Sequence, residues 1–181
     1  IWDQKEILPV LDREERLLRP LNYPEKSPGH GMVTIEVSGK KVVVINILGR
    51  LFMDPMDDPF AALDKALAHH KRGLTASAIL IDFHGEASSE KMAAAYYVAD
   101  RATVLVGTHT HVPTSDRRIL DGGLAYQTDL GMTGDYDSVV GMKKEVPLER
   151  FTKKYSSDRL MPAEKEATLC GLYIETDDKT G

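Results

Sequence analysis

The middle of the chain alternates short apolar runs with polar connections, and the first two runs are typical of a β-hairpin. Residues 32–37 alternate apolar and polar side chains, and residues 41–48 are rich in β-branched residues. The Ser-Gly-Lys sequence at residues 38–40 separates them and favours a tight turn. The uninterrupted apolar run at residues 42–45 predicts a strand that is covered on both faces.

Three histidines, His30, His69 and His70, lie in segments where we expect no catalytic or metal-binding role. Residues 60–72 repeat apolar side chains at helical spacing, which predicts a helix with one buried face. His69 and His70 fall in its last turn, where a partly positive imidazole suits the helix dipole, so we expect both at the surface. His30 lies in a loop rich in Pro and Gly at residues 22–31 and is expected to be solvated.

Residues 78–106 have the pattern of a βαβ unit. An apolar run at 78–83 is followed by a helical pattern at 89–101, with Ser88 placed to cap it, and by a second apolar run at 103–106. In such sheets, ligand sites lie beyond the carboxyl ends of the strands. These two ends are therefore where the sequence predicts a functional site.

The remaining segments have weaker patterns. Residues 3–18 predict one or two short helices, because Pro9 interrupts the spacing. Beyond residue 113 we expect a hairpin, a short helix and a strand, at residues 117–128, 147–155 and 169–176.

Both ends of the chain look truncated. The chain opens on Ile1 rather than Met, and residues 177–181 resemble a hairpin turn without a return strand. We therefore expect residues 1–181 to belong to a single domain, with part of its site missing from this sequence.

Composition excludes several classes of protein. The chain has 42% hydrophobic and 28% charged residues and no apolar run near the roughly 18 residues of a membrane span, which excludes a transmembrane protein. The absence of a signal-peptide pattern favours a cytoplasmic protein. The formal net charge of -5 provides no general attraction for nucleic acid, so any phosphate must be bound locally. Cys170 is the only cysteine, which rules out an intramolecular disulfide, and its apolar neighbours predict a buried thiol in a strand.

The candidate chemistry lies in three histidines that follow the two apolar runs. His84 follows the first run, and His109 and His111 follow the second. Two histidines one residue apart in an extended segment project to the same side. Imidazole suits Zn, Mn and Fe, and three such ligands leave an open position on the metal. We therefore predict a metal site formed by His84, His109 and His111.

The neighbouring residues support this prediction. Asp82 and Glu86 flank His84, where carboxylates can accept hydrogen bonds from metal-binding imidazoles and orient them. Thr108 and Thr110 are candidates for contacts with substrate oxygens, although threonine at a strand end is more often there for its β propensity. A His-x-His pair alone is a weak signal, and the alternative is that all three histidines form structural hydrogen bonds.

The three histidines do not decide the reaction, because carbonic anhydrase-like, amidohydrolase-like and phosphoesterase-like sites all use a His-x-His pair. In a carbonic anhydrase-like site the ligands come from an antiparallel sheet, whereas a helical pattern directly follows His84 here, which disfavours this alternative. An amidohydrolase barrel needs several more βα units than the chain after His111 can supply.

Three segments carry a resemblance to a known family. Residues 81–91 (IDFHGEASSEK), 106–112 (VGTHTHV) and 127–134 (QTDLGMTG), with Trp2-Asp3, resemble the bacterial YmdB-type phosphodiesterases of the calcineurin-like metallophosphoesterase superfamily. The resemblance implies an α/β fold, a calcineurin-like metallophosphoesterase sandwich of two mixed β-sheets flanked by helices.

The resemblance also implies an activity. It implies two divalent or trivalent metal ions, iron or manganese, and hydrolysis of cyclic nucleotides or related, RNA-derived phosphodiesters by a metal-activated hydroxide. His84, His109 and His111 match the family's three carboxy-terminal metal-site histidines. The family's other ligands and its acid-catalytic His would lie upstream of Ile1, so no catalytic residue is assigned in this chain. The resemblance thus implies that residues 1–181 are the carboxy-terminal two thirds of the family's domain.

A second hypothesis from a different class is a metal-stabilised regulatory or scaffold protein without turnover. A phosphodiesterase assay with added manganese separates the two hypotheses. For either hypothesis we expect no membrane partner, and a homo-oligomer is compatible with the sequence.

Overall fold

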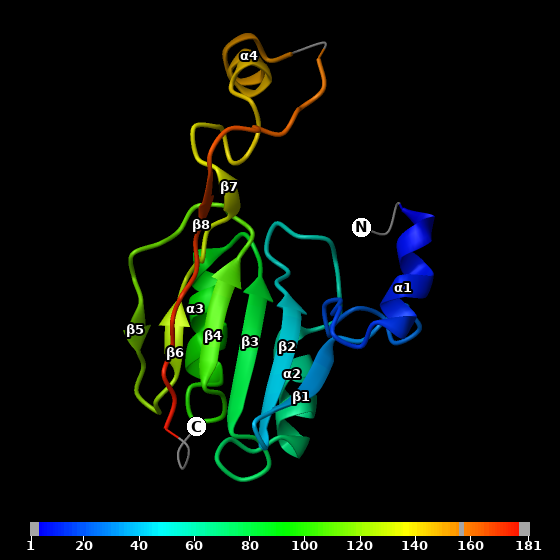
Figure 1. Cartoon of the computed structure of the whole chain (residues 1–181), viewed down its shortest axis with the longest axis vertical. Coiled ribbons are helices and arrows are strands. Elements are labelled where there is room, and N and C mark those ends of the chain that lie inside the picture. The colour runs from blue at the N-terminus through cyan, green and yellow to red at the C-terminus, as the bar shows by residue number, and fades with distance from the viewer. Residues whose placement is uncertain (1–3, 156–157, 178–181) are drawn as a thin grey trace.

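The computed structural model describes residues 4–155 and 158–177 and has a mixed α/β architecture (Figure 1). A six-stranded sheet has the order β1-β2-β3-β4-β6-β5, and a separate two-stranded sheet pairs β7 with β8. The elements in chain order are η1 (Lys5–Ile7), α1 (Leu8–Arg13), β1 (Met32–Val37), β2 (Lys40–Leu48), α2 (Pro59–His69), β3 (Ala78–His84), α3 (Ser88–Tyr97), β4 (Val104–Thr108), β5 (Arg118–Ile119), β6 (Ala125–Gln127), β7 (Thr133–Asp135), α4 (Glu145–Lys153) and β8 (Ala167–Leu169).

The centre of the large sheet is parallel, and its two edges are antiparallel. β2, β3, β4 and β6 run in the same direction, so the arrowheads of the long strands reach the same end of the sheet (Figure 1). β1 pairs with β2, and β5 pairs with β6, as antiparallel neighbours. The two predicted hairpins and the predicted βαβ unit are therefore confirmed.

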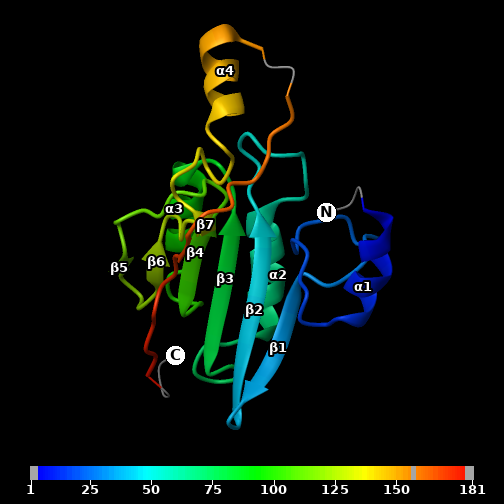
Figure 2. The same cartoon turned by 45° about the horizontal axis from the view of Figure 1, so that its top comes forward.

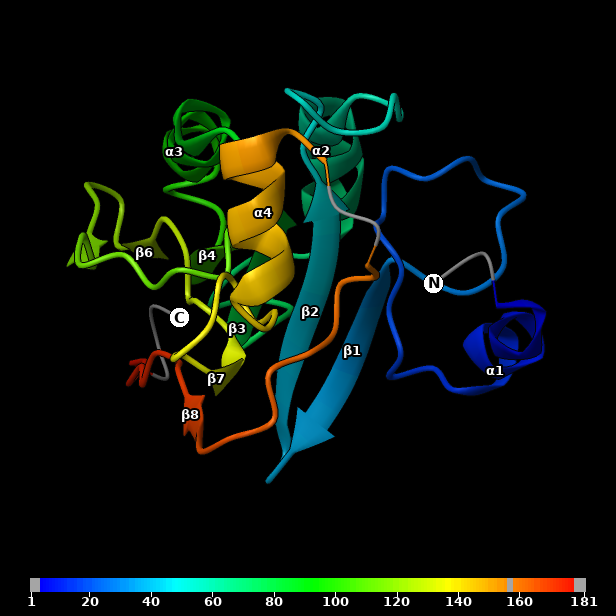
Figure 3. The same ribbon diagram turned by 90° about the horizontal axis from the view of Figure 1, so that it is seen from above.

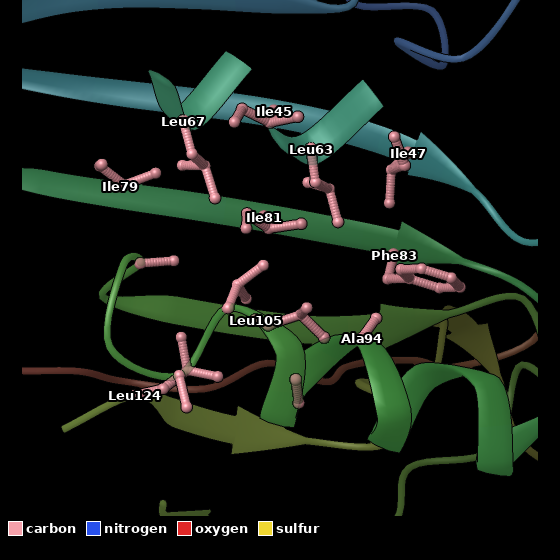
Figure 4. Packing of buried hydrophobic residues seen from close by; sticks show 14 of the residues in the cluster. Ile45, Ile47, Leu63, Leu67, Ile79, Ile81, Phe83, Ala94, Leu105 and Leu124 are labelled. Atoms are coloured by element: carbon pink, nitrogen blue, oxygen red, sulfur yellow. The ribbon is translucent and has the colours of Figure 1, made fainter. Parts of the chain in front are cut away.

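The core lies between one face of this sheet and the helices α2 and α3, which both cover that face (Figure 3). Figure 4 shows Leu63 and Leu67 of α2 packed over Ile45, Ile81 and their neighbours. These side chains are at most 1% exposed. Burial of each stabilises the fold by about 1.5–3 kcal/mol, so the helical spacing of apolar residues in α2 is explained by this contact.

The opposite face of β2 is only partly covered by the described residues. Val43 and Ile45 are buried, whereas Val42 and Val44 are half-buried. The prediction that residues 42–45 are covered on both faces is therefore wrong for the described part of the chain, because α2 and α3 lie on the same side of the sheet.

The ends of α2 and α3 differ in how they are capped. Asp58 Oδ1 accepts a hydrogen bond from the backbone N–H of Phe60 at 2.8 Å, and α2 ends at His69, earlier than predicted. The prediction that Ser88 caps α3 is wrong, because the helix already includes Ser88 and its N-cap residue, Ala87, has no side-chain oxygen. The buried carboxylate of Glu90 instead accepts from backbone N–H groups of the loop that follows β2.

The terminal segments correct further predictions. Pro9 lies in the first turn of α1, where a missing N–H costs nothing, so it starts the helix rather than interrupting it. The strand predicted at 169–176 is wrong, because β8 ends at Leu169 and residues 170–176 are not in a strand. The predicted helix at 147–155 is α4. Cys170 therefore lies outside a strand and is half-buried, where its Sγ accepts a hydrogen bond from the Tyr136 hydroxyl at 3.2 Å. The Trp2-Asp3 pair and most of the turn predicted at 177–181 lie outside the described residues.

Within the described ranges, every helix is too short or too polar to cross a membrane.

Candidate functional site

Two of the predicted ligand positions meet at the carboxyl ends of neighbouring parallel strands. β3 ends at His84 and β4 ends at Thr108, and these two residues are partners in the strand register. His109 is the next residue, so segments distant in the sequence come together here. Figure 2 shows this end of the sheet, where the arrowheads of β2 and β3 point toward α4.

A chain of hydrogen bonds determines which nitrogen of His84 carries the proton. The Asn46 amide and the Thr108 hydroxyl both donate to the carboxylate of Asp82, at 2.7 and 2.8 Å. Because a hydroxyl has one proton, Thr108 Oγ1 must accept from Nδ1 of His84, at 2.9 Å. His84 is therefore protonated at Nδ1, and its Nε2 carries a lone pair. Burial, and then the nearby His109, lower the pKa of His84 and favour the neutral ring.

His109 presents its own nitrogen to that lone pair. Nδ1 of His109 lies 3.2 Å from Nε2 of His84, and the two rings meet edge to face. Nε2 of His109 lies 3.2 Å from a carboxylate oxygen of Glu86, which can only accept a hydrogen bond. A neutral His109 therefore directs a lone pair at the lone pair of His84. A proton or a cation between the two nitrogens removes this repulsion.

This arrangement fits a bound metal ion. Histidines that bind metals usually donate their other N–H to a carboxylate, a carbonyl or a similar acceptor, as His84 does to Thr108 and His109 does to Glu86. Nitrogens that each bind one ion at about 2.1 Å lie about 3.0–3.4 Å apart, and the observed separation of 3.2 Å falls in this range. The donor set is therefore suitable for a metal held by His84 and His109.

His111 has a different position. Its Nδ1 donates to the Val140 carbonyl oxygen at 2.8 Å, and the side chain is exposed. His109 and His111 have φ angles of 112° and 66°, so the segment is not extended, and the alternation argument for their common direction does not apply. In the described part of the chain, no three His, Cys, Asp or Glu side chains are grouped closely enough to hold a metal. The three-histidine set therefore stays a prediction.

The two threonines also differ. Thr108 contacts both Asp82 and His84, which makes it part of the histidine-orienting network. The Thr110 hydroxyl contacts the backbone of Val112 at 3.4 Å, and the backbone N–H of Thr110 donates to Asp129. A contact between either hydroxyl and a substrate oxygen stays a prediction.

Sequence reasoning missed three residues behind this site. Asn46 is the one polar residue in an otherwise apolar stretch of β2, and that interruption was a usable signal. Lys91 and Asp129 are fully buried and form an ion pair of 2.9 Å. Nothing in the sequence distinguishes Lys91 from a surface lysine of a helix, because its partner lies 38 residues away.

A cavity of about 560 Å³ lies elsewhere. It is bounded by α2 and the segment before β1, and none of the predicted metal or substrate residues lines it. His69 and His70 do line it. His69 is exposed, as predicted, whereas His70 is half-buried.

The sequence matches a family model and a named bacterial enzyme. The family model described as "YmdB-like protein" matches residues 1–181. The 2',3'-cyclic-nucleotide 2'-phosphodiesterase of Bacillus subtilis (strain 168) is 46% identical over 179 residues, which cover 99% of this chain and 67% of that protein.

Two solved structures have the same fold. A hypothetical protein from Thermus thermophilus has a TM-score of 0.84 at 45% identity, over 92% of this chain and 64% of that chain. A novel phosphatase from Mycoplasma pneumoniae has a TM-score of 0.81 at 32% identity, over 92% of this chain and 60% of that chain. The chain thus spans about two thirds of the length of these proteins, and the expected fold class is confirmed.

Proposed function

This chain belongs to the YmdB-like protein family, and we propose that it forms the larger part of a metal-dependent phosphodiesterase. The observation that carries the proposal is the pair of facing nitrogens, Nε2 of His84 and Nδ1 of His109, at 3.2 Å. Each ring has its other nitrogen within hydrogen-bond distance of a partner, so the two facing nitrogens are the ones left for a ligand bond. Such a pair of fixed imidazoles favours a cation over a purely structural contact.

We propose His84, His109 and His111 as ligands of two ions, iron or manganese. When bound there, such ions would supply polarisation of a phosphoryl group and would lower the pKa of a bound water molecule to about 7. Thr108 and Asp82 hold the Nδ1 proton of His84, and Glu86 holds the Nε2 proton of His109. The hydrogen bond from His111 to Val140 leaves its Nε2 as the nitrogen for a ligand bond.

We propose a small phosphodiester, a 2',3'-cyclic nucleotide, as the substrate. The Bacillus subtilis relative named for this activity is 46% identical to the chain. Hydrolysis of the ester bond at O2' adds one water, releases the 2'-hydroxyl and leaves a nucleoside 3'-phosphate. The negative formal charge of the chain, -5, means that recognition of such an anion has to be local.

The test measures turnover of bis-(p-nitrophenyl) phosphate and of 2',3'-cyclic AMP by the protein at its full natural length. The metal-free protein is titrated with manganese or iron(II), and the products are separated as 2'- and 3'-phosphates. We expect metal-dependent release of the 3'-phosphate. Absence of turnover at every metal concentration would favour the scaffold hypothesis, and release of the 2'-phosphate would reject the proposed bond.

A matched pair of variants assigns the activity to the site. His84→Ala should abolish turnover, whereas His69→Ala, which removes an exposed imidazole on α2, should leave it unchanged. Equal loss in both variants would mean that the assay reports a general effect of losing histidine.

We also propose that residues 1–181 belong to a single domain of a cytoplasmic protein. The continuous core from β2 to β6 supports the single domain. Size measurement in solution tests a homo-oligomer, and cell fractionation tests the location.

A further inference from the structure

The backbone at His109 is unusual for a residue with a side chain. Its φ angle of 112° lies in a region that glycine favours, and such a conformation is unfavourable for a residue with a Cβ. A residue is kept in this conformation only when its surroundings hold it there. The contacts on either side of His109 therefore decide where its ring points.

The peptide group before His109 is held by Lys91. The carbonyl oxygen of Thr108 accepts a hydrogen bond from Nζ of Lys91 at 2.8 Å, and another from the backbone N–H of Gly85 at 3.3 Å. Lys91 projects from α3, and its side chain is 0% exposed. A Cβ added at Gly107 would lie 2.7 Å from Cδ of Lys91 and 1.7 Å from the Thr128 carbonyl oxygen, so the lysine fits closely against β4.

The peptide group after His109 is held by Asp129. The backbone N–H of Thr110 donates to Oδ2 of Asp129 at 3.0 Å, and the same oxygen accepts from Lys91 at 2.9 Å. Oδ1 accepts from the backbone N–H of Gly131 at 2.9 Å, so both carboxylate oxygens are used. The Asp129 side chain is also 0% exposed.

We propose that Lys91 and Asp129 are positioning residues, an ion pair that fixes both peptide groups flanking His109 and so directs its ring at His84. Holding the peptide groups on both sides of one residue restrains both its φ and its ψ. The hydrogen bonds that Lys91 Nζ and Asp129 Oδ2 make to Thr108 and Thr110 go to the backbone on either side of His109, so the restraint acts through the backbone. This inference rests on the proposed function only where it concerns metal binding, because the restraint on the backbone is a separate property.

The experiment uses the full-length protein with Lys91→Met, Asp129→Asn and the double variant. Lys91→Met leaves a buried charge without its partner, whereas the double variant has none and should recover much of the lost stability. We measure the free energy of unfolding, the hydrogen exchange of the Thr110 amide, and the manganese affinity. Arg101→Met, which removes a surface ion pair with Asp64, is the matched control.

If the pair positions His109, Thr110 amide exchange and manganese affinity should stay changed in the double variant even though its stability recovers. In the double variant, the Thr110 amide should exchange about tenfold or more faster than in the unvaried protein, while the amides of β3 and β4 keep their protection. Manganese affinity should be about 10- to 100-fold weaker. Arg101→Met should change neither.

If Thr110 exchange and manganese affinity return to the unvaried values together with stability, the pair is a structural element only and the inference is overturned. If the unvaried protein binds no metal, the proposed function fails, and the exchange of Thr110 still decides the positioning role by itself. If Lys91→Met does not fold, Asp129→Asn and the double variant carry the same comparison.

Discussion

His84 and His109 are neighbours in space but are held in place by different parts of the structure. His84 is the last residue of β3, in regular strand backbone, and a side-chain network through Thr108, Asp82 and Asn46 orients its ring. His109 lies just past the end of β4 with a positive φ, and its position depends on a buried ion pair behind the loop.

The difference shows two ways to orient an imidazole. At His84 the strand register supplies the backbone, so only the rotation of the ring has to be determined. At His109 the backbone itself is in an unfavourable conformation, so it needs tertiary contacts before the ring can be placed. We therefore expect substitutions behind His109 to affect both stability and metal affinity, and substitutions behind His84 to affect metal affinity with little change in the fold.

The largest expected effect is the loss of an imidazole. His84→Ala removes one of the two facing nitrogens, and we expect turnover to fall by about 1,000-fold or more, since metal activation supplies several kcal/mol. Steady-state kinetics with saturating manganese measures the change. Full turnover with unchanged metal content in this variant would end the metal-site assignment.

The next effect is on stability. Lys91→Met leaves the carboxylate of Asp129 buried and without its charged partner, and the free energy of unfolding should fall by about 3–5 kcal/mol. Arg101→Met breaks a partly exposed pair and should cost about 1 kcal/mol or less. Urea unfolding of both variants measures the two changes. Equal losses in the free energy of unfolding would show that the buried Lys91 pair contributes no more to stability than the partly exposed Arg101 pair.

A smaller effect separates the network behind His84 from the fold. Thr108→Val keeps the shape of the side chain but removes the hydroxyl between His84 and Asp82, so the ring loses its fixed proton position. Manganese affinity should weaken by about 10- to 100-fold. The Thr110 amide should keep its protection from exchange, and a loss of protection there would contradict the separation of the two regions.

The smallest expected effect is a change in how the free energy of unfolding depends on pH in acid, in the Asp129→Asn variant. Burial alone raises the pKa of Asp129, but hydrogen bonds from Lys91, Gly131 and Thr110 outweigh it and hold the pKa below its ordinary value. The carboxylate therefore stabilises the fold fully above the ordinary pKa of about 4, and the contribution is lost as pH falls through the lowered pKa. Unfolding free energies measured from pH 6 to pH 3 should fall less steeply for Asp129→Asn, and an unchanged slope would reject this linkage.

Local sequence patterns were sufficient for the elements that place the site. The hairpin of β1 and β2 and the βαβ unit from β3 to β4 follow from alternation, turn residues and helical spacing. Because neighbouring parallel strands end at the same edge of a sheet, the proximity of His84 and His109 could also be expected. The Ser88 cap and the strand at 169–176 were mispredicted, since caps and short edge strands depend on contacts that local patterns do not contain.

The sequence alone therefore determined the order of the elements, the identity of the candidate ligands and the end of the sheet at which they lie. Only the tertiary structure revealed the proton position on His84, the backbone of His109 and the buried partner of Lys91. The physical reason is separation along the chain. Asn46, Lys91 and Asp129 act on residues 17 to 38 positions away, so their roles exist only after the strands have paired and water has been excluded from between them.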